Sequence, residues 1–142
     1  MNAPDTTHPG RFALPVRVYY EDTDAAGVVY YANYLRYLER GRTEWLRALG
    51  FDQTDLAAER GIAFAVRGLQ IEYLKPAKLD DELVVVSHVS SLGRAQLVFE
   101  QRVEREAQAL VTASVRVACI DTARLKAAPL PEMLRARVEA LI

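Results

Sequence analysis

The sequence has few of the residues that build metal centres and disulfide frameworks. It contains one cysteine, Cys119, and two histidines, His8 and His88. A single cysteine cannot form an intramolecular disulfide, and no cysteines or histidines are spaced as in a metal site. Cys119 lies in the mostly apolar run 115–120, where a thiol packs as a small hydrophobic side chain. We therefore expect no metal, a buried thiol and a structural His88.

Long apolar runs and a strong net charge are also missing. No apolar stretch reaches the length of about 18 residues that spans a membrane. The first ten residues have neither the basic start nor the apolar segment of a secretory signal. The net charge of −1 gives no overall attraction to nucleic acid or to an anionic membrane. We expect a cytoplasmic protein without a nucleic-acid partner and without stable membrane insertion.

The composition is typical of one folded domain. Of the 142 residues, 51% are hydrophobic and 26% are charged, and a chain of this length can bury a sizeable core. We expect a flexible tail over 1–12, a domain over 13–130 and a short helix or tail over 131–142.

Hydrophobic periodicity predicts a helix-containing antiparallel sheet. A strand is expected over 14–20, a long helix over 32–49 and a short helix over 52–60. Four further strands, over 62–73, 82–91, 95–105 and 109–121, are expected to follow one another as a meander. The order predicts an α+β fold in which one curved antiparallel sheet wraps a long central helix.

The long helix has a periodic stripe and an internal glycine. The positions near 3.6-residue spacing are Leu35, Leu38, Arg42, Trp45, Leu46 and Leu49, and the other charged residues of the helix lie mostly on other faces. Gly41 lies inside the helix, where glycine costs about 1 kcal/mol relative to alanine. Its presence predicts close packing of the helix against a neighbouring strand or partner.

An acidic turn precedes this helix and is the strongest candidate for chemistry. It contains Glu21, Asp22 and Asp24, followed by Gly27. Acidic residues in loops often only cap a helix or solvate a turn. Asp24 is the best candidate, because Gly27 allows close backbone approach and unpaired N–H groups at the helix start can hold an oxyanion. An ionised carboxylate here suits a nucleophile or a general base. No Ser-His-Asp or Cys-His arrangement has comparable support.

The run 20–34, followed by Glu39-Arg40 and Arg42-Thr43-Glu44, resembles the hotdog-fold acyl-CoA thioesterases. It is most similar to the 4-hydroxybenzoyl-CoA thioesterase-like group and, within it, to the Tol-Pal-associated acyl-CoA thioesterases. The similarity covers roughly residues 14–125. It implies a single hotdog domain that hydrolyses acyl-CoA to free acid and CoA. It also implies that Asp24 is the catalytic carboxylate and that the Tyr31 backbone N–H polarises the thioester carbonyl.

The resemblance further implies a set of substrate contacts and partners. Residues expected to bind substrate, with the cations facing the CoA phosphates, are Gly27, Val28, Tyr30, Asn33, Arg67, Lys75, Lys78 and Arg94. Each cation is equally well explained as a solvated surface charge, and the tyrosines as packing at the helix entrance. The substrate is acyl-CoA, with acyl-carrier protein as another carrier, and no cofactor is implied beyond the CoA of the substrate. The active site is expected at the interface of a homodimer or homotetramer, completed by the partner around 62–66.

One position departs from the nearest subgroup, and two other functions stay open. Tol-Pal-associated relatives have histidine where this chain has Tyr31, whereas the 4-hydroxybenzoyl-CoA group has tyrosine. A backbone role at this position is compatible with either side chain. The alternatives are a non-enzymatic acyl-binding or scaffolding module and a hotdog dehydratase. A dehydratase usually needs a histidine in the site, and the motif has none.

Overall fold

A computed structural model describes residues 10–142. Its elements in chain order are β1 Phe12–Arg17, α1 Tyr34–Ala48, α2 Gln53–Arg60, β2 Ile62–Tyr73, β3 Glu82–Leu92, β4 Gln96–Arg105, β5 Gln108–Asp121, β6 Lys126–Ala127 and α3 Glu132–Glu139. Two 3-10 turns, Tyr20–Asp22 and Tyr31–Asn33, connect β1 to α1. Most of the expected N-terminal tail, including His8, lies outside the described residues.

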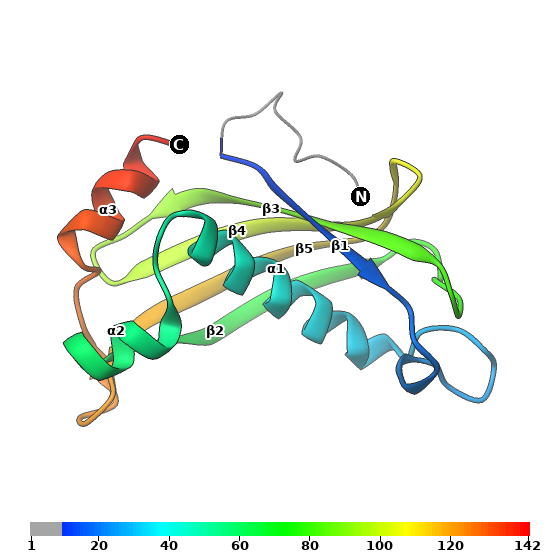
Figure 1. The fold of residues 1–142 in the computed structure, drawn as a ribbon, viewed down its shortest axis with the longest axis horizontal. Helices are drawn as coiled ribbons and strands as arrows, with labels where there is room; N and C mark the ends of the chain where they lie inside the picture. The colour runs from blue at the N-terminus through cyan, green and yellow to red at the C-terminus, as the bar shows by residue number, and fades with distance from the viewer. Residues whose placement is uncertain (1–9) are drawn as a thin grey trace.

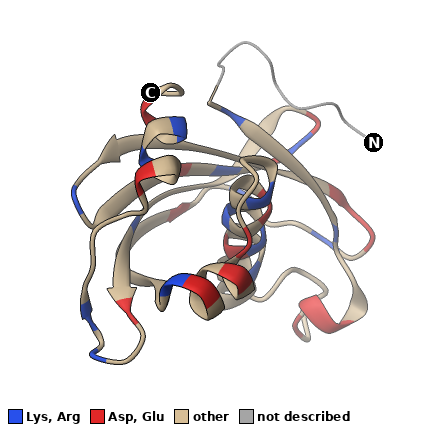
Figure 2. Cartoon of the chain, turned by 60° about the vertical axis from the view of Figure 1, so that its left-hand side comes forward, with Lys and Arg blue, Asp and Glu red and all other residues tan. Residues whose placement is uncertain are grey.

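A single curved antiparallel sheet wraps around α1 (Figure 1). The strands lie in the order β1-β3-β4-β5-β2, and β6 pairs with β5. Figure 2 shows the sheet curling round the helix, with basic and acidic residues interspersed along α1. The α+β class and the sheet-wrapped helix predicted from the sequence are confirmed.

The position of β2 in the sheet differs from the expected meander. Of the four strands expected in the meander, only β3, β4 and β5 follow one another as neighbours, whereas β2 lies at the far edge and pairs with β5. The prediction was wrong because β1 fills the place beside β3, from Phe12 opposite Ser87 to Arg17 opposite Glu82. Within residues 10–142, β2 therefore has a strand on one side only.

The middle of α1 lies very close to the sheet. A Cβ atom on Gly41 would lie 2.7 Å from Val85 Cγ1 and 3.0 Å from Ser87 Oγ, so only glycine fits without a shift. The buried Gln101 donates hydrogen bonds from Nε2 to the Leu38 carbonyl and to Ser87 Oγ, both at 2.9 Å. The close packing predicted at Gly41 is confirmed, and these bonds fix α1 to β3 and β4.

The core between α1 and the sheet is apolar and densely packed. Trp45 packs edge to face on Phe99, with ring centroids 5.0 Å apart. Cys119 in β5 is fully buried, as expected, and its Sγ lies 3.8 Å from the Pro129 carbonyl oxygen. Burial raises the pKa of this thiol. Leu35 is an exception to the predicted stripe, because it is exposed on the outer side of α1.

The short helices have clear local causes. Asp52 caps α2 by accepting hydrogen bonds from two backbone N–H groups, and Gly61 ends it with a φ of 64°. α3 buries Leu134 and Val138, and Arg135 donates a 2.5 Å hydrogen bond to a carbonyl in the β3–β4 turn. No helix in residues 10–142 combines the length and apolar character needed to cross a membrane.

Candidate active site

The acidic turn folds as a tight hairpin. The Asp24 N–H donates to the Val28 carbonyl at 2.9 Å, and the Gly27 N–H donates to the Asp24 carbonyl at 3.0 Å. Thr23 and Val29 form an antiparallel bridge below this loop. Gly27 has a φ of 80°, which is the left-handed position that such hairpin loops require. The hydrogen bonds therefore fix the backbone of Asp24 in one orientation.

Both carboxylate oxygens of Asp22 accept hydrogen bonds from the protein itself. The residue is only 7% exposed, and its Oδ2 accepts a hydrogen bond from the Tyr19 N–H at 2.8 Å. Oδ1 accepts from Asn33 Nδ2 at 3.0 Å. Burial and the neighbouring Asp22 carboxylate raise the pKa of the Tyr37 hydroxyl, which keeps this buried phenol protonated. Asp22 thus joins the acidic turn to the start of α1.

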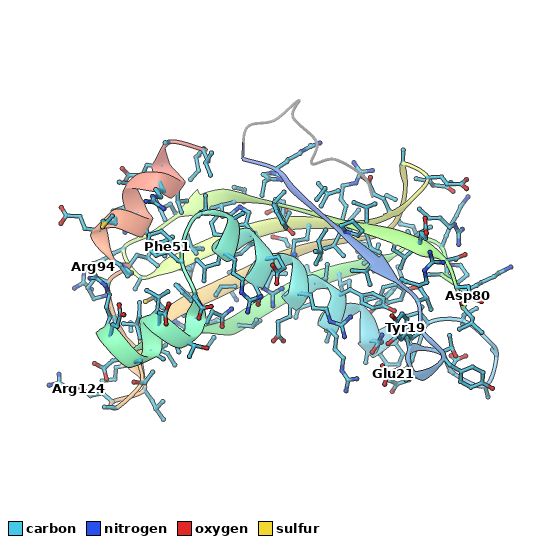
Figure 3. All side chains as sticks on the ribbon, in the orientation of Figure 1. Tyr19, Glu21, Phe51, Asp80, Arg94 and Arg124 are labelled. Atoms are coloured by element: carbon cyan, nitrogen blue, oxygen red, sulfur yellow. The ribbon has the colours of Figure 1, made fainter. Side chains whose placement is uncertain are left out.

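Asp24 and Glu21 are exposed, but they differ in how they are held. Asp24 Oδ1 accepts a 2.8 Å hydrogen bond from the Ala26 N–H. Among residues 10–142, Asp24 Oδ2 has no hydrogen-bond partner, so it faces solvent. Glu21 lies beside Tyr19 at the same end of the molecule (Figure 3) and makes no side-chain hydrogen bond within the described chain. Asp24 is the carboxylate of the turn that is both oriented and open.

Tyr31 lies at the first residue of the 3-10 turn that leads into α1. The helix predicted to begin at residue 32 therefore starts as a 3-10 turn and becomes α-helical only at Tyr34. The Tyr31 carbonyl accepts a 3.0 Å hydrogen bond from the Tyr73 hydroxyl of β2. Its N–H has no partner among residues 10–142, as is usual for the first donors of a helix. Tyr73 therefore holds the backbone of Tyr31 through the peptide group that follows this N–H.

The tyrosines at the helix entrance divide into buried and exposed members. Tyr34 is buried, and its hydroxyl accepts from the Ala77 N–H at 3.0 Å. Tyr31 is 63% exposed, with its ring 4.9 Å from that of Tyr30 and 6.2 Å from that of Tyr73. Packing accounts for Tyr34, whereas Tyr30, Tyr31 and Tyr73 form an exposed aromatic surface beside the turn.

Comparison with known proteins identifies the family. The sequence profile of the thioesterase-like superfamily matches residues 18–138. The chain belongs to this superfamily. It is 50% identical over 125 residues to the acyl-CoA thioesterase YbgC of Haemophilus influenzae, which covers 88% of this chain and 92% of that protein. It is 47% identical over 124 residues to the acyl-CoA thioester hydrolase YbgC of Escherichia coli, with 87% and 92% covered.

Solved structures agree with this assignment. A probable thioesterase from Bartonella henselae has a TM-score of 0.82 and 40% identity, covering 85% of this chain and 99% of that one. A 1,4-dihydroxy-2-naphthoyl-CoA thioesterase from Synechocystis has a TM-score of 0.85 and 25% identity, covering 93% and 98%. The hotdog fold expected from the resemblance is confirmed for this superfamily member.

Some of the residues that were predicted to bind substrate lie close together in this protein, and others lie apart. Val28 forms an antiparallel bridge with Lys78, so Lys78 and the loop containing Lys75 lie beside the acidic turn. Arg67 is exposed in the middle of β2. Arg94 lies in the β3–β4 turn, at the opposite end of the molecule from the acidic turn (Figure 3). A single thioesterase subunit therefore groups the two lysines with Asp24 and leaves Arg94 apart.

A cavity of about 220 Å³ between α1, β2, β4 and β5 was not predicted. Its lining residues are Glu39, Arg42, Thr43, Trp45, Leu46, Gln53, Phe64, Val66, Leu97, Phe99 and Val117. Arg42 projects into it and donates from Nη1 to Gln101 Oε1 at 3.0 Å. Burial lowers the pKa of this guanidinium, which nevertheless stays charged. The signal in the sequence was the one charged residue in the apolar stripe of the helix.

No group of three or more metal-ligating side chains occurs in the part of the chain that the structure describes. His88 lies in β3 opposite Glu100, on the face of the sheet away from α1. His88 is therefore remote from the acidic turn.

Proposed function

We propose that this protein hydrolyses acyl-CoA thioesters with Asp24 as the catalytic carboxylate and the Tyr31 N–H as the oxyanion donor. Acyl-CoA thioester hydrolysis follows from the superfamily and from relatives at 47–50% identity. The assignment of residues rests on one observation: Asp24 is the carboxylate of the turn that the backbone orients while leaving an oxygen open.

The proposed chemistry uses one carboxylate and one backbone amide. The thioester carbonyl oxygen accepts a hydrogen bond from the Tyr31 N–H, which stabilises the negative charge of the tetrahedral intermediate. Asp24 takes a proton from water as the water oxygen attacks the carbonyl carbon. The C–S bond then breaks, CoA leaves as the thiolate, and the free acid remains. The step as proposed uses no metal or redox cofactor.

Direct attack by Asp24 is the other route open to the same geometry. The carboxylate would form a mixed anhydride with the acyl group and release CoA, and water would then hydrolyse the anhydride. A single turnover in ¹⁸O-labelled water tests for the anhydride. Label appears in Asp24 only if the anhydride forms and water attacks its aspartyl carbon. Label confined to the released acid shows that water attacked the acyl carbon, of either the thioester or the anhydride, and trapping the acyl-enzyme with hydroxylamine then distinguishes these two.

The substrate would lie across the exposed aromatic surface of the turn. Gly27, Val28 and Tyr30 border this surface, and Lys75 and Lys78 can meet the CoA phosphates as mobile cations. Asn33 is bound to Asp22 and would act by holding the turn. Arg67 and Arg94 would contribute from a partner subunit. The proposal includes a cytoplasmic location, and acyl-carrier protein thioesters are a second substrate class.

The proposal also includes a homodimer formed through β2. This twelve-residue edge strand exposes Val66 by 46% and Leu69 by 40%. An unpaired apolar edge invites pairing with another strand. If two copies pair antiparallel along the full strand, Val66 lies opposite Leu69 of the partner. Such a dimer brings the turn of one copy near the cavity of the other, and pairing of dimers would give the tetramer.

Thioesterase assays with Asp24→Asn test the function. We expect kcat/KM on the best acyl-CoA substrate to fall about 10³-fold, in the range for loss of an acid–base group. Glu21→Gln is the matched control and should retain wild-type kcat/KM, because Glu21 is exposed and makes no side-chain hydrogen bond within residues 10–142. Circular dichroism and unfolding curves should be unchanged in both variants.

Two results would contradict the proposal. Full activity in a folded Asp24→Asn protein would remove the catalytic role of Asp24. Tight acyl-CoA binding by the wild-type protein without hydrolysis of any thioester would indicate a binding module.

A further inference from the structure

We propose that the cavity beneath α1 holds the far end of the acyl group and that Arg42 selects acyl groups ending in a carboxylate. This inference rests on the proposed function, since it names the substrate class of that site. Its basis is the guanidinium of Arg42, which has no carboxylate in contact with it within residues 10–142.

Arg42 is a cation in a pocket that has both polar and apolar walls. Its guanidinium has five N–H donors. Within residues 10–142 its side chain makes one hydrogen bond, to the neutral amide oxygen of Gln101. Glu39 lines the same cavity, and its negative charge favours the charged form of Arg42 from a distance. No carboxylate lies within 4.0 Å of the guanidinium in the described chain. A partly buried charge of this kind is costly unless an anion accompanies it.

Gln101 fixes where the guanidinium points. Its amide nitrogen is held by the Leu38 carbonyl and Ser87 Oγ, so its oxygen is left facing Arg42. The guanidinium is thus oriented before any ligand arrives, which reduces the entropy lost on binding. A planar fork of donors in this position matches a carboxylate better than a hydroxyl or an apolar tip.

The remaining walls suit a carbon chain. Trp45, Phe64 and Phe99 supply aromatic surface, and the cavity volume of about 220 Å³ exceeds the roughly 150 Å³ that admits benzene in an engineered apolar cavity. The cavity borders β2 at Phe64 and Val66, the edge proposed to meet the partner. An acyl chain held at the catalytic turn of one subunit can therefore extend into the cavity of the other and place its terminal carboxylate on Arg42.

Matched pairs of substrates test the proposal. Suberyl-CoA and octanoyl-CoA have the same number of carbons in the acyl group and differ at its far end. We expect the wild-type protein to favour suberyl-CoA at least tenfold in kcat/KM. Arg42→Met should reduce kcat/KM for suberyl-CoA by 10- to 100-fold and leave that for octanoyl-CoA within threefold. Arg42→Lys should retain part of the preference, and Arg36→Met, on the exposed side of α1, should retain all of it.

A binding measurement keeps the test independent of turnover. Calorimetry on the wild-type protein should give at least tenfold tighter binding of octanoate than of octanamide, and Arg42→Met should abolish the difference. Equal kcat/KM for the two thioesters, or a preference that survives in folded Arg42→Met, would overturn the proposal. If Arg42→Met does not fold, equal wild-type binding of octanoate and octanamide overturns it instead. Carboxylate-selective binding without any thioester hydrolysis would refute the proposed function but leave this pocket assignment intact.

Discussion

At its start, α1 is joined to an exposed turn, whereas its middle is locked into the sheet. The turn is ordered by backbone hydrogen bonds that leave Asp24 and Tyr31 open to solvent. In the middle of α1, Gly41 packs directly against β3, and the Gln101 amide donates hydrogen bonds to both α1 and β3. The contrast indicates that one helix can both hold the core and present reactive groups, because these tasks fall on separate turns.

The largest effect on stability is expected where the helix touches the sheet. Gly41→Val should lower the free energy of unfolding by about 3 kcal/mol, since overpacking costs about 1–3 kcal/mol and a Cβ here already meets Val85 at 2.7 Å. Urea denaturation measures the change. Gly93→Ala is the control and should be near neutral, because its added Cβ would have no neighbour closer than 3.6 Å. Equal effects of the two substitutions would show that α1 can move away from the sheet freely.

The two aspartates of the turn should separate stability from activity. Asp22→Ala leaves the buried Asn33 amide and the Tyr19 N–H without their acceptor, so we expect a loss of about 2–3 kcal/mol. Asp24→Ala should change stability by less than about 0.5 kcal/mol, as for most surface substitutions. Thermal unfolding and thioesterase assays on both variants provide the comparison. A stable, inactive Asp22→Ala protein would reverse the roles assigned here.

The hydroxyl of Tyr73 holds the Tyr31 carbonyl, in the peptide group next to the N–H that is proposed to bind the oxyanion. Tyr73→Phe removes the 3.0 Å hydrogen bond to the Tyr31 carbonyl and should cost about 0.5–1 kcal/mol of stability. We expect kcat to fall about tenfold with little change in KM, because misorientation weakens an interaction made mainly in the transition state. Tyr20→Phe is the control and should have no effect, because Tyr20 is highly exposed at the start of the acidic turn. A change in KM alone would assign Tyr73 to substrate binding.

The smallest effect is expected at the loop beside the turn, and it depends on pH. Burial alone would raise the pKa of Asp81, but hydrogen bonds from the Lys78 N–H and from Arg105 lower it below the ordinary value of 3.8. The stability that Asp81 contributes is therefore present above about pH 4 and lost as pH falls through the depressed pKa. Asp81→Asn should cost about 0.5 kcal/mol at pH 7, and the difference from wild type should shrink towards pH 3.

Urea denaturation at the two pH values measures this difference. Asp80→Asn is the control, because asparagine also tolerates the left-handed conformation that Asp80 adopts, with a φ of 70°. A difference between wild type and Asp81→Asn that stays constant with pH would remove the ionised carboxylate from the explanation.

Local signals in the sequence predicted most elements but not their neighbours. The strand over 62–73 was predicted with the bounds of β2, because its turn residues and alternation are local. Its pairing with β5 depends on competition from β1 for the edge of β3, which no local pattern records. The 3-10 start of α1 was missed for a similar reason, since Tyr31 is held by Tyr73, 42 residues further along the chain.

The sequence motif predicted where the candidate site lies, but it did not predict which role each residue has there. Three acidic residues looked alike in the sequence, and burial together with the hydrogen bonds from Tyr19 and Asn33 distinguishes Asp22 as structural. Arg42 was visible as a charge in an apolar stripe, but its meaning required the cavity and Gln101 beside it. Burial and pairing are tertiary properties, so the spacing of residues could not assign them.

The single buried thiol can be used to measure how often the sheet opens. Cys119 has no exposed surface and lies in β5, the strand that joins β4 to β2. A thiol reagent can reach it only when this part of the sheet opens, so the labelling rate of the native protein gives the frequency of that opening. Because no other cysteine occurs in the chain, the mass of the product reports one site without mutation or added probe. Ligands that bind only the closed sheet should slow the labelling in proportion to their occupancy.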